Sequence, residues 1–98
     1  MYINVFFSEE DIVDIIFIPD ILNDISLLQT EFLQWLFNKD NNHEYWVFSN
    51  GEKIYCRYGI DAFVKWINDN KLYAFSEKAK VEKRNCRDLS QENQKFIF

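Results

Sequence analysis

The sequence predicts an α+β fold. The expected architecture is a single small domain, with a short, mostly antiparallel sheet and a central Asn-Gly hairpin packed against about three helices. Two observations predict it. Short apolar runs rich in β-branched and aromatic residues alternate with longer segments whose apolar residues recur at helical spacing. The 98-residue chain also has only two glycines and one proline, so most residues are expected in regular elements or short turns.

The N-terminal segment predicts a strand followed by a helix. Residues 2–7 are a short β-rich apolar run. Ser8 then has the position of a helix N-cap, and acidic residues, which the helix dipole favours, follow it directly. A first helix is therefore expected at residues 9–17. Pro19 ends it, because proline has no backbone N–H to donate.

A longer helix is expected at residues 20–38. Its predicted buried stripe recurs at helical spacing and consists of Ile21, Ile25, Leu28, Phe32, Trp35 and Leu36. The same spacing puts Asp20, Asp24 and Glu31 together on one neighbouring flank. This helix is expected to pack on the sheet and to expose that acidic flank.

A β-hairpin and a further helix follow. Asn50 and Gly51 separate two β-rich runs at residues 44–48 and 53–58, and Asn-Gly favours the type I′ turn that joins hairpin strands. Residues 60–70 then show apolar side chains on one helical face. This segment is expected to be a helix that packs on the hairpin.

The last part of the chain is less regular in pattern. A short strand is expected at residues 72–75, and the conformation of residues 77–87 is left open. The predicted globular domain spans residues 1–88, and residues 89–98 are expected to be a tail, either a frayed helix or without regular structure. Three apolar residues suggest that the end of this tail docks on something: Phe96, Ile97 and Phe98.

Composition places the chain among small cytoplasmic proteins. Hydrophobic residues make up 48% and aromatic residues 18% of the chain, which is enough for a real core. Cys56 and Cys86 are too few for a disulfide scaffold and are expected to be reduced thiols. The early apolar segments are interrupted by carboxylates, so neither a signal peptide nor a membrane span is expected.

Charge is unevenly divided along the chain. Residues 1–44 contain nine carboxylates and the single base Lys39, whereas residues 45–98 contain ten Lys or Arg and seven acids. The formal net charge is −5. An acidic surface on a small domain favours docking of a basic partner. A solvated helix face is the ordinary explanation for such charge, because the outside of an amphipathic helix is polar in any case.

No motif in the sequence predicts catalysis, a metal or a cofactor. His43 is the only histidine, and metal-ligand spacings such as C-x-x-C or H-E-x-x-H do not occur. Cys56 could pair with His43 as nucleophile and base, but a small apolar side chain in a strand is the more ordinary role for a cysteine there. Gly51 and Gly59 cannot build a phosphate-binding loop. We therefore expect a protein that is not an enzyme.

Nucleic acid is not an expected partner. A basic cluster contains Lys78, Lys80, Lys83, Arg84 and Arg87, but Glu77, Glu82 and Asp88 are interleaved with it in a net acidic chain. An aromatic run resembles a base-stacking platform and contains Tyr45, Trp46, Phe48, Tyr55 and Tyr58. Strand alternation assigns about half of that run to the core, and the other half is expected to form an aromatic interface patch.

The chain resembles a class of small cytosolic immunity proteins that bacteria pair with toxins, including those of contact-dependent growth inhibition. Three features over roughly residues 8–70 carry the resemblance: an acidic amphipathic N-terminal half, an aromatic Asn-Gly hairpin at residues 44–58, and a helix with Phe63, Trp66 and Ile67. The resemblance implies a stoichiometric inhibitor of a cognate basic toxin. Carboxylates would stand in for substrate phosphates over a nuclease active site.

Such an inhibitor needs acidic residues that steer the encounter and aromatic residues that anchor the complex. The expected steering residues are Glu10, Asp11, Asp14, Asp20, Asp24 and Glu31, and the expected anchors are Trp46 and Trp66. Two other classes of function stay open. An anti-defence protein of a phage or mobile element would use the same acidic mimicry and would differ in its genetic neighbourhood. A small enzyme would lose its activity on replacement of His43 and Cys56.

Overall fold

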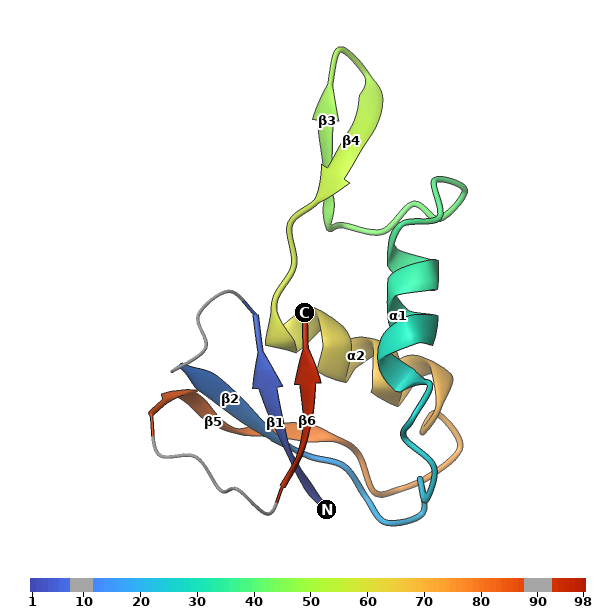
Figure 1. The fold of residues 1–98 in the computed structure, drawn as a ribbon. Coiled ribbons are helices and arrows are strands. Elements are labelled where there is room, and N and C mark those ends of the chain that lie inside the picture. Colours follow the sequence, from blue (N-terminus) through green and yellow to red (C-terminus); the bar gives the residue numbers. More distant parts are fainter. Residues whose placement is uncertain (8–11, 88–92) are drawn as a thin grey trace.

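The computed structural model describes residues 1–7, 12–87 and 93–98 (Figure 1). These residues contain two α-helices and six strands. The helices are α1 Leu28–Leu36 and α2 Ile60–Asn70. The strands are β1 Tyr2–Phe6, β2 Val13–Phe17, β3 Trp46–Ser49, β4 Glu52–Cys56, β5 Lys80–Cys86 and β6 Gln94–Ile97.

Four of the strands form one mixed sheet in the order β5-β2-β1-β6. β2 is antiparallel to both β1 and β5, whereas β6 runs parallel to β1. β3 and β4 form a separate antiparallel pair that projects from the body of the domain (Figure 1). The hairpin is thus not central to the sheet, contrary to the sequence prediction, because among the described strands β3 and β4 pair only with each other.

The turn of this hairpin has the backbone geometry that its residues favour. Ser49 and Glu52 are paired in register, and the two residues between them have positive φ angles, 51° for Asn50 and 78° for Gly51. A type I′ turn requires positive φ at both central positions, and its twist matches that of the strands. Asparagine tolerates this conformation and glycine adopts it without steric cost.

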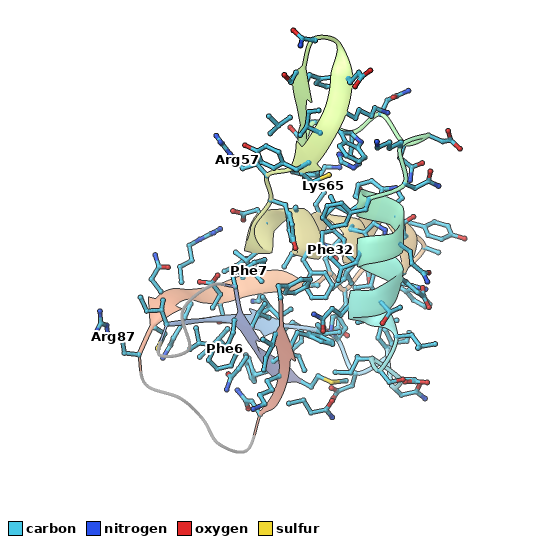
Figure 2. All side chains as sticks on the ribbon, turned by 45° about the horizontal axis from the view of Figure 1, so that its top comes forward. Phe6, Phe7, Phe32, Arg57, Lys65 and Arg87 are labelled. Atoms are coloured by element: carbon cyan, nitrogen blue, oxygen red, sulfur yellow. The ribbon has the colours of Figure 1, made fainter. Side chains whose placement is uncertain are left out.

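The main core lies between the four-stranded sheet and the two helices, and Figure 2 shows Phe7 and Phe32 in this densely filled region. Strand alternation points every second side chain of the sheet toward the helices. The buried residues that meet there include Ile3, Val5, Ile16 and Phe96 from the sheet and Leu28, Phe32, Leu36, Phe63 and Ile67 from the helices. Both described helices lie on this side of the sheet. On the opposite face Tyr2 is 51% exposed, whereas Asn4 at the centre of β1 is buried.

The helix predicted at residues 9–17 is wrong in the described part of this segment, because residues 13–17 form the strand β2. The proposed N-cap, Ser8, lies outside the described residues. The apolar spacing of the segment also fits a helix, but Val13, Ile15 and Ile16 are β-branched and favour a strand. β2 is paired on both sides, so cross-strand hydrogen bonds and packing decide its conformation.

α1 is much shorter than the helix predicted at residues 20–38. Residues 20–27 form turns and irregular structure, and Asp24 explains part of this. Its Oδ1 accepts hydrogen bonds from the backbone N–H and the hydroxyl of Ser26, at 3.0 and 2.7 Å. Short polar side chains that bond the nearby backbone compete with helical hydrogen bonds. About three helices were expected, and the described residues contain two, because the first predicted helix is replaced by the strand β2.

The helix predicted at residues 60–70 is confirmed by α2, Ile60–Asn70. The strand predicted at residues 72–75 is wrong. The backbone N–H of Phe75 donates to the carbonyl of Leu72 at 3.0 Å, which closes a turn. Leu72 is fully buried, so its apolar character serves the core rather than a strand.

The C-terminal part belongs to the sheet. The segment at residues 77–87 contains β5, and residues 94–97 form β6, which pairs with β1. The domain therefore extends past the boundary predicted at residue 88, and a frayed helix is wrong for the end of the chain. The docking suggested by its last apolar residues is found, since Phe96 is buried against Phe63, with 5.4 Å between ring centres.

An ion pair joins α2 to β5 and makes stability depend on pH. Arg84 donates twice to Asp61, at 2.9 and 2.6 Å, and this hydrogen bonding lowers the pKa of the Asp61 carboxyl from 3.8. A carboxyl with a lowered pKa in the folded state stabilises the fold above its unfolded pKa, and this contribution is lost as pH falls through the folded value. We expect Asp61→Asn to lower the urea midpoint slightly at pH 7, and the difference from wild type to shrink between about pH 5 and pH 3. Arg84→Gln should reproduce this profile, and a difference independent of pH would contradict it.

Candidate protein-binding site

The β3–β4 hairpin projects away from the body of the domain (Figure 1) and has exposed apolar side chains. Phe48, Ile54 and Tyr55 are 58%, 53% and 46% exposed, and we call these three residues the hairpin patch. No other described strand pairs with either edge of this two-stranded sheet. Exposed aromatic side chains and open strand edges are both features by which proteins dock on one another.

The base of the hairpin is held firmly against the end of α1. Trp46 and Cys56 are cross-strand partners and both are buried. The indole N–H of Trp46 donates to the carbonyl of Asn41 at 2.7 Å, and Cys56 Sγ lies 3.4 Å from the carbonyl oxygen of Leu36. Lys53 donates to the same Asn41 carbonyl at 3.0 Å and lies 5.4 Å from the centre of the Trp46 ring. Because its base is fixed in this way, the hairpin loses little conformational entropy when it binds a partner.

A cavity of about 240 Å³ lies at the base of the hairpin, between α1, α2 and the segment that leads into β3. Aromatic rings line it, from Trp35, His43, Tyr45 and Trp66, together with the charged residues Glu44, Lys65 and Asp69. Figure 2 shows Lys65 and Arg57 near the hairpin base. Lys65 pairs with Asp69 at 2.7 Å, and Asp69 together with Glu44 raises the pKa of this ammonium group. Aromatic faces and carboxylates together suit a cationic group, and we call this site the basal cavity.

Backbone groups occupy both ring nitrogens of His43. The N–H of Tyr45 donates to Nδ1 at 3.2 Å, so Nδ1 carries no proton. Nε2 then carries the proton and donates to the carbonyl of Leu36 at 2.8 Å. The ring also stacks on Trp46, with 5.3 Å between centres. His43 therefore fixes one wall of the basal cavity and has no ring nitrogen left for a metal or for proton transfer in this arrangement.

Two further groups near the hairpin base are held in their protonated forms. Burial raises the pKa of the Tyr45 hydroxyl, and the neighbouring Glu44 carboxylate raises it further. Burial also raises the pKa of the Cys56 thiol. A protonated thiol is a poor nucleophile, and a protonated phenol is a hydrogen-bond donor. This chemistry favours recognition over covalent catalysis at the site.

The predicted acidic flank does not form. Asp20, Asp24 and Glu31 were expected on one side of a helix, but residues 20–27 are not helical and only Glu31 lies in α1. Glu10 and Asp11 lie outside the described residues. The four described carboxylates of the predicted set each have a partner within the domain. The pairs are Asp14 with the backbone N–H of Asn85, Asp20 with the Met1 ammonium, Asp24 with Ser26, and Glu31 with Lys71.

The two predicted tryptophan anchors are buried. Trp46 is 7% exposed and Trp66 is 6% exposed, so neither presents a ring on the outer surface. Trp66 lines the basal cavity and could meet only a group that enters it. Both side chains serve mainly the core, which is the usual role of an aromatic residue with an apolar helical or strand position.

The residues that instead define the candidate site are the hairpin patch and the carboxylates of the basal cavity. Phe48 and Tyr55 belong to the aromatic run in the sequence, and part of that run is expected to form an interface patch, so the sequence indicated these two residues. Glu44 and Asp69 gave no such signal, because they are far apart in sequence and only the packing of α2 against the hairpin base brings them to one cavity. The candidate site thus combines the projecting hairpin with the cavity at its base.

Within the described part of the chain, no group of three or more His, Cys, Asp or Glu side chains is arranged to hold a metal ion. Neither described helix is long and apolar enough to cross a membrane. Comparison of the chain with protein-family models, with curated proteins and with solved structures gives no match. The function must therefore be argued from the side chains themselves.

Proposed function

We propose that this chain is a protein-binding inhibitor, an immunity protein that neutralises a cognate basic toxin by docking on it. The hairpin patch is the observation that carries the proposal, because three large apolar side chains are exposed on a projecting arm whose base is rigidly held. The formal net charge of −5 favours a cationic partner and speeds its diffusional approach.

The basal cavity gives the proposed complex its selectivity for a basic partner. An arginine or lysine side chain of the toxin enters it, stacks on the aromatic walls and meets Glu44 and Asp69. In a nuclease, such cationic side chains are the ones that bind substrate phosphates. When these cationic side chains are bound by the inhibitor, the toxin can no longer bind its substrate. The inhibitor therefore needs no catalytic chemistry of its own.

The test begins with affinity capture of the tagged protein from a lysate of its source, at low and then at moderate salt, with mass spectrometry of what is retained. We expect one basic protein at equimolar amount. That protein is then expressed with and without this chain, and growth is measured. Growth inhibition that this chain relieves supports the proposal. A captured protein whose activity is unchanged in the complex would show that the chain is not its inhibitor.

Phe48→Ser tests the hairpin patch directly. The side chain is 58% exposed, so the substitution should leave folding intact while weakening the complex by about tenfold or more, as for a binding hot spot. Tyr73→Ser is the matched control, because Tyr73 is 75% exposed and lies outside the hairpin. The dissociation constants are measured by calorimetry against the purified partner. Equal constants for the two variants would remove the hairpin from the interface.

A further inference from the structure

The face of the four-stranded sheet opposite the helices carries apolar side chains at its centre and lysines at both edges. Residues that pair in register share a face of a sheet, so the register assigns each side chain. We call this surface the open face, and its residues are Tyr2, Asn4, Phe6, Ile15, Phe17, Lys80, Lys83, Lys95 and Ile97.

Two aromatic rings from the central strands contact each other edge to face on the open face. The centres of the Tyr2 and Phe17 rings are 5.6 Å apart, and the ammonium of Lys80 lies 5.8 Å from the Phe17 ring centre. Tyr2 is 51% exposed, and Ile97 at the edge is 61% exposed. A solvated sheet face is ordinarily polar, so the exposed Tyr2 ring on a central strand, next to the half-buried Phe17, indicates a surface that meets a partner.

The lysines flank this apolar centre on both sides. Lys83 on β5 pairs in register with Ile15, and Lys95 on β6 pairs with Asn4. Three strand spacings separate the two edge strands, which is about 14 Å. Lys80 pairs with Glu82 at 3.3 Å, whereas Lys83 and Lys95 form no ion pair with any described residue. Among the described residues of the open face, the lysines without an ion pair are thus Lys83 at one edge and Lys95 at the other, and Glu82 lies beside Lys80.

Strand geometry separates part of the charge that is interleaved in the sequence, although Glu82 stays beside Lys80. The expectation that nucleic acid is not a partner rested on the mixture of acids and bases around Lys80 and Arg84. In the fold, Arg84 turns to the helix side and pairs with Asp61. Lys80, paired with Glu82, and Lys83 stay on the open face, and Lys95 joins them from β6. The local charge that a ligand would meet is therefore positive although the whole chain is acidic.

We propose that the open face binds single-stranded nucleic acid. Unpaired bases stack on the exposed ring of Tyr2, which Phe17 supports from beside it, and the lysines at the two edges contact the phosphates. A duplex is excluded as the preferred ligand because its bases are already stacked and cannot reach the rings. A second copy of the chain is disfavoured, since stacking two open faces would bring lysine borders together. This inference is independent of the inhibitor proposal, which uses the hairpin and the basal cavity.

Fluorescence anisotropy of a labelled oligouridylate of about 12 nucleotides, within the usual size of such sites, tests the proposal on the purified, untagged chain. Three lysine contacts predict that log K falls against log salt with a slope of about −2 between about 50 and 200 mM salt. A duplex of the same length should bind at least about tenfold more weakly. No binding at low salt, or a duplex that binds as well, would overturn the proposal. A dimer in sedimentation experiments that protects Tyr2 from labelling would also overturn it, in favour of self-association.

Matched variants separate stacking from charge. Tyr2→Ala should weaken binding by about fivefold or more, the lower end of a base-stacking contact, whereas Tyr73→Ala should leave it unchanged. Replacing Lys83 and Lys95 by Gln should reduce the salt slope by about 1.4, at about 0.7 per lost phosphate contact. The charge-matched control replaces Lys39 and Arg57, both exposed and away from the open face, by Gln. If a variant and its control changed binding equally in either pair, the nucleic acid would bind away from the open face, and the proposal would be wrong. Circular dichroism confirms that each variant is folded.

Discussion

Phe32→Ala is expected to destabilise the domain by about 3–5 kcal/mol, the range for removing a large aromatic side chain from a core. Phe32 is fully buried on α1, and its nearest ring, that of Phe63, lies at 5.2 Å between centres. Four more rings contact it within the same cluster, from Trp35, Tyr58, Trp66 and Phe98. The side chain therefore joins both helices to the end of the chain, and alanine would leave a cavity that these large rings fill poorly.

Urea unfolding followed by far-ultraviolet circular dichroism measures this loss without relying on the neighbouring tryptophans as probes. A domain of this size has a total stability of about 5–15 kcal/mol, so the variant should be partly unfolded at 37 °C. Phe37→Ala is the control, because Phe37 ends α1 but is 49% exposed, and a loss of about 1 kcal/mol or less is expected. Similar losses for the two variants would show that Phe32 is not the centre of the core.

The spacing of apolar residues predicts an element of this fold correctly only where that spacing fits either a helix or a strand, but not both. α2 agrees with its predicted range because its apolar face fits a helix and because Gly59 precedes it. β2 fails because its apolar residues fit both a helix and a strand, and the choice depends on β1 and β5 on either side. β6 fails for the same reason, since its partner β1 lies at the other end of the chain. Pairing between distant segments is what the sequence pattern does not contain.

The candidate site shows the same limit. The aromatic character of the hairpin was visible in the sequence, but which rings face outward depends on an irregularity in the pairing between Val47 and Phe48. The basal cavity combines Trp35, Glu44 and Asp69, which no local spacing links. The acidic flank was predicted from a helix that does not form at residues 20–27, so an error in secondary structure became an error in the site.

Adjacent residues of β6 allow the strand register to be tested with a large expected effect. Phe96 is 8% exposed and faces the core, whereas Ile97 is 61% exposed on the open face. Phe96→Glu would bury a charge without a partner and remove an aromatic ring from the core. We expect a loss of about 4 kcal/mol or more, which is large for a single substitution and could unfold the domain. Ile97→Glu should cost about 0.5 kcal/mol or less, as for an ordinary surface position.

The comparison depends on the register itself, because a shift of one residue would exchange the two faces of β6 and reverse the order of the two variants. Urea midpoints for both proteins, with Phe96→Leu as a milder substitution at the same site, give the answer even where Phe96→Glu does not fold. Phe96→Leu keeps an apolar side chain and should fold with a moderate loss. A greater loss for Ile97→Glu than for Phe96→Leu would contradict the parallel pairing of β6 with β1, and with it the position of Lys95 on the open face.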